Sequence, residues 1–335
     1  FQFRAIQYRT MIDTYRLTQS MYRGSVDTIM HCMSVEWGRH DDVNIEKRFY
    51  MKETRRAFMH RHPIMYAIMT ALSFLLILYF TAHVTQGIEI PGYGGLLLRE
   101  ESALILTMLV LAGFGMLQEI PLEQDNFMDT LKAGGFVLLL DALLLQYERI
   151  LMIENDALPW TQILIFLAFI FLVGLLEETV FRGIIEETLI RSFRPTALGR
   201  LQAAYLTGIL FGLAHVINMS WAADPMAVVF QMVQNVVIGI YLSLIYARAR
   251  NVLAMIFLHA FYDFTSLMMS GIYGIGSMQQ GVEAMNATSL WVLLIYLGPI
   301  VYLTIRILVD AHRQKLRERG TEVAKRGHEG KQAYA

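Results

Sequence analysis

Charged residues are scarce in this chain. Only 17% of its 335 residues are Asp, Glu, Lys or Arg, while 55% are hydrophobic; a soluble domain has about 25% charged and about 45–50% apolar residues. The apolar excess is concentrated in long runs that nearly exclude charge, which favours membrane-spanning helices over a large soluble core. The net charge of -1 gives no field that would favour nucleic acid as a partner.

Cysteine and several protease motifs are also missing. Cys32 is the one cysteine, so an intramolecular disulfide is impossible. The sequence contains no Gly-x-Ser-x-Gly, no His-Glu-x-x-His and no Gly-x-Gly-Asp. A rhomboid-type serine protease and an intramembrane aspartyl protease are therefore disfavoured. No inverted repeat is visible, which argues against a transporter.

Eight apolar runs are the main feature of the chain. A helix needs about 20 predominantly apolar residues to cross the hydrocarbon core of a bilayer. The runs that reach or approach this length cover residues 63–84, 102–117, 131–145, 159–176, 201–217, 225–247, 252–270 and 289–309. The second and third are the weakest, because they are short and contain glycines and Asp141. The sequence predicts an all-α, polytopic transmembrane bundle of about eight spans.

The charges between the runs predict the orientation. Cytoplasmic loops are enriched in Lys and Arg, and a basic cluster precedes the first run: Lys47, Arg48, Lys52, Arg55, Arg56 and Arg61. With this cluster inside, the basic loops after the fourth and sixth runs are inside as well, and the loops placed outside are mainly acidic. The acidic loop after the second run is the exception. We expect a multi-pass integral membrane protein with both termini cytoplasmic, in the plasma membrane if bacterial and in the endoplasmic reticulum if eukaryotic.

Three segments follow from these patterns. Residues 1–62 are predicted to be a cytoplasmic or interfacial segment, in which residues 5–23 carry a loose helical stripe. This stripe suits the membrane surface or packing on the bundle equally well. Residues 63–309 are the predicted membrane domain, and residues 310–335 are a basic cytoplasmic tail that anionic lipid could attract.

A charged cluster ends the fourth run. Glu178 and Arg182 are four residues apart, so on a helix they share a face and can pair. This pairing would leave Glu177 on an adjoining face, where a carboxylate in an apolar helix can act as a general base on water. The structural alternative is a helix end at the cytoplasmic interface, with solvated acids and a snorkelling arginine.

Two histidines lie in later runs. His215 follows Phe211 by one turn near the end of the fifth run, and His259 precedes Asp263 by four residues in the seventh. An aspartate can fix the tautomer of a histidine, or both can orient an oxygen in a site. Packing of His215 in the core and a structural His259–Asp263 pair are the alternatives. Ionisable groups inside a membrane each cost about 2.5–3.5 kcal/mol and are usually functional, so a shared intramembrane polar cavity is the simplest explanation of all three clusters together.

The three clusters resemble, in order and spacing, the signature motifs of the CAAX protease and bacteriocin-processing (CPBP) family, the Abi-type group that includes the Ras-converting CAAX endopeptidase. The matching residues span about 159–270 and read Glu177-Glu178-x-x-x-Arg182, Phe211-x-x-x-His215 and His259-x-x-x-Asp263. An eight-helix layout also fits that family. The resemblance implies an intramembrane endopeptidase.

The resemblance also implies roles for the residues. Glu177 and His215 would activate the attacking water. His259 and the fourth residue after it would stabilise the oxyanion, and Glu178 and Arg182 would support the site.

Asp263 departs from the pattern of the prenyl-protein enzymes, which usually have Asn there. A neutral amide donates a hydrogen bond to an oxyanion, whereas an ionised Asp263 cannot; it must be protonated or orient His259 instead. The family has been described both as metalloproteases and as glutamate-dependent enzymes. We expect no cofactor, although two histidines and a carboxylate could bind zinc.

The expected partners are the lipid bilayer and a peptide or protein substrate in or at the membrane, prenylated or not, with no nucleic acid. Two other functions stay open: a non-catalytic membrane scaffold or immunity-type protein with the same fold, and a proton-coupled transporter.

Overall fold

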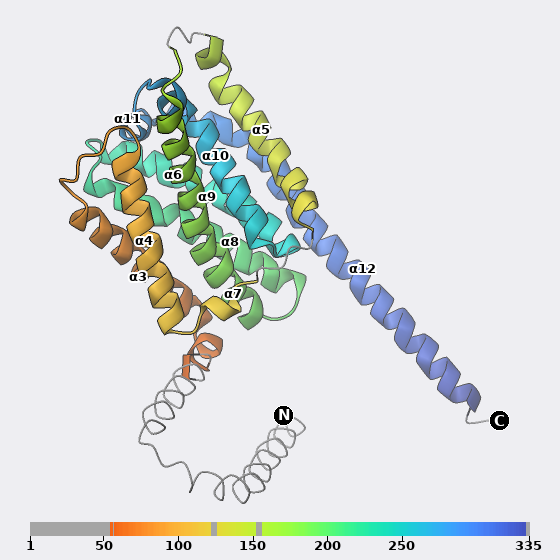
Figure 1. Ribbon diagram of the computed structural model, residues 1–335. Helices are drawn as coiled ribbons and strands as arrows, with labels where there is room; N and C mark the ends of the chain where they lie inside the picture. Colours follow the sequence, from red (N-terminus) through yellow and green to blue (C-terminus); the bar gives the residue numbers. More distant parts are fainter. Residues whose placement is uncertain (1–53, 56, 122–125, 152–155, 333–335) are drawn as a thin grey trace, which may run out of the picture. The chain divides into compact units, whose positions relative to one another are not determined.

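The computed structural model describes residues 54–332, apart from residues 56, 122–125 and 152–155. The predicted amphipathic stripe at residues 5–23 lies outside the described residues, as do Cys32 and most of the basic cluster. The described part of the chain is helical and contains no strand (Figure 1). The all-α, polytopic fold class is thus confirmed.

The helices follow one another with short connections. The long ones are α3 (Pro63–Val84), α4 (Gly94–Gly113), α5 (Phe127–Leu151), α6 (Trp160–Glu178), α8 (Ala197–Ala214), α9 (Pro225–Ala249), α10 (Val252–Tyr273) and α12 (Leu294–Gln332). The short ones are η1 (Leu117–Glu119), η2 (Thr179–Glu186), α7 (Glu187–Ser192), η3 (His215–Ser220), α11 (Met278–Glu283) and η4 (Ala287–Leu293). The last helix runs through the predicted boundary at residue 310 without a break.

Six stretches in the described residues are long and apolar enough to cross a membrane, so the predicted count of eight is wrong. They are Pro63–Val84, Trp160–Ser192, Ala197–Ser220, Pro225–Ala249, Val252–Tyr273 and Ala287–Arg317. The two weakest predicted spans, 102–117 and 131–145, do form helices, α4 and α5. Both helices extend beyond the apolar run into charged sequence: α4 includes Arg99, Glu100 and Glu101, and α5 begins near Asp129 and Lys132. The multi-pass character of the chain stands, because six spans remain.

Capping residues fix where the central helices begin. The side chains of Thr196, Asp224 and Asn251 each accept a hydrogen bond from a backbone N–H in the first turn of α8, α9 and α10, respectively, which satisfies donors that the helix cannot. At the other end, Arg250 and Gly274 take the left-handed conformation that terminates α9 and α10. These signals hold the ends of the helices that carry the polar residues.

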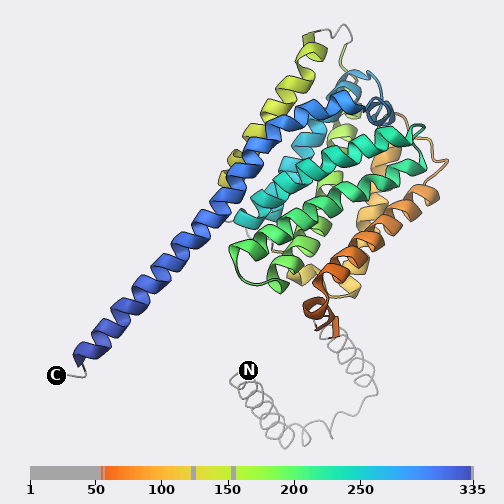
Figure 2. The ribbon, with the colours of Figure 1, turned by 180° about the vertical axis from the view of Figure 1, so that it is seen from behind.

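Close contacts through glycine bring the central helices together. α8 and α9 run side by side (Figure 2), and a Cβ atom on Gly212 would collide with the backbone of Val236. α6 packs between α4 and α10 (Figure 1). A Cβ atom on Gly174 of α6 would lie 2.9 Å from the carbonyl oxygen of Ile256 in α10. The charged cluster at the end of α6 is therefore held one turn from this contact.

Candidate active site

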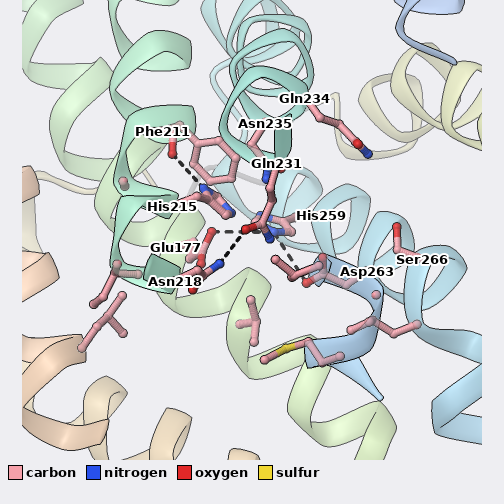
Figure 3. Close-up of a pocket in the computed structure, with 18 of the residues that line it drawn as sticks. Glu177, Phe211, His215, Asn218, Gln231, Gln234, Asn235, His259, Asp263 and Ser266 are labelled. Atoms are coloured by element: carbon pink, nitrogen blue, oxygen red, sulfur yellow. Dashed lines mark hydrogen bonds and ion pairs between the residues drawn. The ribbon is translucent and has the colours of Figure 1, made fainter. Parts of the chain in front are cut away.

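A cavity of about 380 Å³ lies among the central helices. Its lining side chains come from α3, α4, α6, α8, α9, α10 and α11 and from the short helices between them, and Figure 3 shows several of the polar ones. Four of the predicted site residues line it: Glu177, His215, His259 and Asp263. The first and last of these, Glu177 and Asp263, are 86 positions apart in the chain. All four line the same cavity, as predicted from the sequence.

The two adjacent glutamates face different surroundings. They end α6, and the chain continues in a π-helix over Thr179–Glu186; π-turns are rare and frequent at functional sites. The Glu177 side chain reaches the cavity and is 19% exposed. Glu178 is fully buried, and its Oε1 atom accepts a hydrogen bond from Nη1 of the equally buried Arg182 at 2.7 Å. This is the pairing that the four-residue spacing predicted.

Arg182 links the glutamate cluster to two other helices. Its Nη2 atom donates to the carbonyl oxygen of Gly239 in α9 at 3.2 Å. Its guanidinium carbon lies 4.6 Å from the centre of the Phe211 ring, a distance at which a cation is attracted to the ring face. Phe211 in turn packs edge-to-face against His215 and His259, with ring centres 5.3 and 5.6 Å apart. Phe211 is therefore a packing residue, as expected, and it sets the spacing of both histidines.

His259 is held by carboxylates on both sides of its ring. Its Nδ1 atom lies 2.7 Å from Oε1 of Glu178, and its Nε2 atom lies 3.8 Å from Oε2 of Glu177 and 3.6 Å from Oδ2 of Asp263. Glu178 is buried beside Arg182 as an acceptor, so Nδ1 is the atom that donates. The two Nε2 distances exceed those of hydrogen bonds. Nε2 thus faces the cavity between two carboxylates that it does not directly bond.

His215 presents one ring nitrogen to the cavity. It is the first residue of η3, directly after α8, and its Nδ1 atom lies 3.1 Å from the carbonyl oxygen of Phe211. A carbonyl oxygen can only accept, so Nδ1 carries the proton in this contact. In the neutral ring Nε2 is then an acceptor, the form that can take a proton from water.

The sequence interpretation missed the amide side chains of the cavity. Asn218, Gln231, Gln234 and Asn235 all line it (Figure 3). Asn218 Nδ2 donates to Gln231 Oε1 at 2.8 Å, and Gln234 Nε2 donates to the hydroxyl of Tyr262 at 2.7 Å. Three of these amides lie in an otherwise apolar span, α9, and that signal could have identified them. Attention to ionisable residues alone passed over them.

A charged pair from α4 was missed as well. Arg99 and Glu100 line the cavity, although they precede the apolar run that was predicted as the second span. Their place in the cavity follows from the N-terminal extension of α4 beyond that run. Hydropathy places charged residues outside a membrane span. It therefore did not predict that Arg99 and Glu100 line the cavity.

The carboxylates and histidines do not form a closed metal-ligand cluster. Among the described residues, no group of three or more His, Cys, Asp or Glu side chains is arranged to hold a metal ion. In the cavity, Nδ1 of each histidine is engaged with a protein acceptor, which leaves Nε2 of each ring for a water, a substrate or an ion. The residues present can transfer protons and donate or accept hydrogen bonds through these Nε2 atoms.

Comparison with known proteins bears on this arrangement. Residues 159–265 match the family model described as type II CAAX prenyl endopeptidase Rce1-like. The matched segment contains all three charged motifs. No curated protein matches the chain, and no solved structure matches it. The family match confirms the resemblance carried by the motifs.

Proposed function

We propose that this chain, whose residues 159–265 belong to the type II CAAX prenyl endopeptidase family, is an intramembrane endopeptidase that hydrolyses a peptide bond with a water molecule activated by Glu177 and His215. One observation carries the proposal: Glu177, His215 and His259, from three separate helices, line a single cavity of about 380 Å³. Burying these groups without a partner outside the protein would be costly. In a hydrolytic site each of these side chains has a role in activating water or binding the substrate carbonyl.

Water activation is assigned to Glu177 and His215, the roles that the motif resemblance implies, because both line the cavity and can accept a hydrogen bond from water there. The Glu177 carboxylate takes a proton from water, while Nε2 of His215 accepts the second hydrogen bond of that water and orients it. The water oxygen attacks the carbonyl carbon, a C–O bond forms, and the carbonyl electron pair moves to the oxygen. When the C–N bond breaks, the departing nitrogen takes the proton held by Glu177. General acid–base help of this kind contributes about 10²–10⁴ in rate.

The second histidine is assigned to the oxygen that becomes charged. His259 donates through Nδ1 to Glu178 at 2.7 Å, so its Nε2 atom also carries a proton, directed into the cavity, only when the ring is the imidazolium. Asp263, 3.6 Å from Nε2, orients the same ring from the other side. Glu178 and Arg182 do not line the cavity and act by positioning His259 and Phe211.

A metal-free reaction is proposed. Its support is chemical: the Glu177 carboxylate and Nε2 of His215 both line the cavity, and a carboxylate base with a hydrogen-bond acceptor can deprotonate and orient a water without an ion. The metalloprotease alternative makes a different prediction with chelators, which is given in the Discussion.

The substrate is proposed to be a membrane-associated peptide or protein segment. Phe74, Leu75 and Leu78 of α3 and Phe169 of α6 line the cavity together with the amides of α9. Apolar side chains together with polar groups suit an extended peptide that carries an apolar or prenylated side chain. The multi-pass protein would meet such a substrate at the membrane, with both termini on the cytoplasmic side.

Two further functions are separated from this one by the same variants. A scaffold or immunity-type protein with this fold would keep its phenotype in Glu177→Ala and His215→Ala. A proton-coupled transporter would show uptake into liposomes that depends on a proton gradient. The hydrolase loses cleavage in both variants and shows no such uptake.

The test uses the full chain, purified and reconstituted in liposomes. The probe is an internally quenched peptide that ends in a farnesylated Cys-aliphatic-aliphatic-Met sequence, with the unmodified peptide alongside it. We expect cleavage of at least one probe by the wild type and a loss of about 10²-fold or more in Glu177→Ala and His215→Ala. Equal cleavage by the wild type and Glu177→Ala would contradict the proposal.

A further inference from the structure

Asp263 leaves the oxyanion without the donor that an amide at that position would supply. An ionised carboxylate has no N–H or O–H to donate, and Asp263 is already drawn towards His259, with 3.6 Å between Oδ2 and Nε2. Hydrolysis of a peptide bond nevertheless places a negative charge on the carbonyl oxygen, and donors fixed in advance around that oxygen are usually the largest single contribution to such catalysis. Another neutral donor in the cavity would make the site complete.

The amides of α9 are the candidates, and three of the four amides in the cavity already have partners. Asn218 donates to Gln231, and Gln234 donates to Tyr262. Among the residues that the structure describes, the Asn235 side chain takes part in no hydrogen bond. Asn235 is only 8% exposed and lines the cavity. Its amide atoms are not among the fully buried atoms that lack a partner, so its two unused N–H groups are accessible from the cavity and can donate to a group bound there.

The packing of α8 against α9 sets Asn235 at the level of His215. On one side of it, four residues along α9, Gly239 lies against the ring of Phe211. On the other side, again four residues away, Gln231 accepts from Asn218. Phe211 and Asn218, the partners of Gly239 and Gln231, flank His215 in the chain, just as Gly239 and Gln231 flank Asn235.

Asn235 therefore faces the stretch of cavity wall that carries His215. Residues four apart share a helix face, so its side chain points in the direction of Gln231, into the cavity (Figure 3). A carbonyl that is attacked by water held at His215 and Glu177 would lie within the same space.

We propose that the Asn235 amide donates a hydrogen bond to the oxyanion, in place of the amide that position 263 lacks. As the water oxygen bonds to the carbonyl carbon, the carbonyl electron pair moves to the oxygen, and an N–H of Asn235 donates to it. The hydrogen bond weakens again when the C–N bond breaks and the carbonyl reforms. This inference rests on the proposed function and adds a catalytic residue from a fourth helix to it.

The test is a kinetic comparison on the quenched farnesylated peptide with the full chain in liposomes. Asn235→Ala and the nearly isosteric Asn235→Asp both remove the N–H donor. We expect kcat to fall about 10²–10³-fold in each, the cost of removing one oxyanion donor, with KM nearly unchanged. The control is Gln279→Ala, which removes an exposed amide of α11 that does not line the cavity; its kcat should stay close to that of the wild type.

The Asn235→Ala substitution in an Asp263→Asn background tests whether Asn235 replaces an amide at position 263. Asp263→Asn restores an amide at position 263, so Asn235→Ala should cost less kcat in this background than in the wild type, a non-additivity expected for groups that share one partner. A wild-type kcat in Asn235→Ala, a loss confined to KM, or an equal kcat loss in both backgrounds would overturn the inference. The melting temperature is measured for each variant, and a kcat loss in a variant that melts like the wild type is a loss of catalysis and not of folding.

The same assay distinguishes the two proposals. If Glu177→Ala is inactive while Asn235→Ala cleaves like the wild type, the inference fails and the hydrolase stands. If Glu177→Ala cleaves like the wild type, the hydrolase fails and the role of Asn235 falls with it.

Discussion

Glu178 and His259, 81 positions apart in the chain, are joined by a contact of 2.7 Å between Oε1 and Nδ1. The same Oε1 atom accepts from Arg182 at 2.7 Å, so one buried carboxylate ties α6 and the π-helix to α10. The contact fixes which nitrogen of His259 faces the cavity. It also explains why a fully buried glutamate lies next to one that reaches the cavity.

This relationship predicts a large effect on stability at position 178. Glu178→Ala leaves the buried Arg182 guanidinium without its carboxylate, and breaking a buried ion pair by removing one partner costs about 3–5 kcal/mol. We expect a clear drop in the melting temperature of the purified protein in detergent. Glu177→Ala is the matched control, because Glu177 is partly exposed and makes no such pair. Equal melting temperatures for the two variants would contradict the positioning role of Glu178.

The close approach of α6 and α10 is a second point of sensitivity. In Gly174→Ala the new Cβ would press on the backbone of Ile256, and overpacking of this kind costs about 1–3 kcal/mol. Because Gly174 lies one turn before Glu178, the helices should also separate at the site and cleavage should fall. Gly113→Ala is the control, since nothing lies within 4 Å of a Cβ there. The melting temperature and cleavage rate are measured for both variants. Unchanged values in Gly174→Ala would contradict the prediction and show that α10 can shift to accept the new methyl group.

Metal dependence gives a third prediction. If water is activated by Glu177 and His215 alone, cleavage should persist after dialysis against EDTA and in the presence of 1,10-phenanthroline, and added zinc should not stimulate it. The measurement is the initial rate on the quenched peptide before and after chelation. A rate that is lost with the chelator and restored by zinc would favour the metalloprotease alternative.

The orientation of the chain gives a fourth prediction. Six spans and eight spans are both even numbers, so the correction of the count leaves both termini on the same side. From the positive-inside rule we expect that side to be the cytoplasmic one. Tags at the two ends should both be cleaved by a protease added to inverted membrane vesicles, and neither should be cleaved in right-side-out vesicles. Opposite accessibility of the two tags would require an odd number of spans.

The sequence predicted the fold class and the meeting of the three motifs because both depend on local patterns. Runs of apolar residues predict helices in a membrane, and charges are so unfavourable there that several of them indicate a common cavity. The pairing of Glu178 with Arg182 follows from their spacing alone. The pattern within each motif spans one helix or less, and the high cost of isolated charges in a membrane then predicts that the three motifs meet.

The features that were missed depend on packing between helices. The contact of His259 with Glu178 joins α10 to α6, and no spacing rule reaches across that separation. The extension of α4 through Arg99 and Glu100 places charges at the cavity, where hydropathy predicts none. The span count failed for the same reason, since a helix in a bundle can begin well before its apolar run. The amides of α9 were visible in the sequence, but only the register of α8 against α9 distinguishes Asn235 from its neighbours.

The most direct test compares the peptides released by membranes that carry the wild-type chain and the Glu177→Gln variant, with mass spectrometry in water enriched in ¹⁸O. The variant keeps the size of the side chain and removes its ability to take a proton. We predict peptides with ¹⁸O at the newly formed carboxyl terminus from wild-type membranes, reduced by about 10²-fold or more in the variant, as expected for loss of a general base. The same peptides in equal amounts from both membranes would contradict hydrolysis in this cavity.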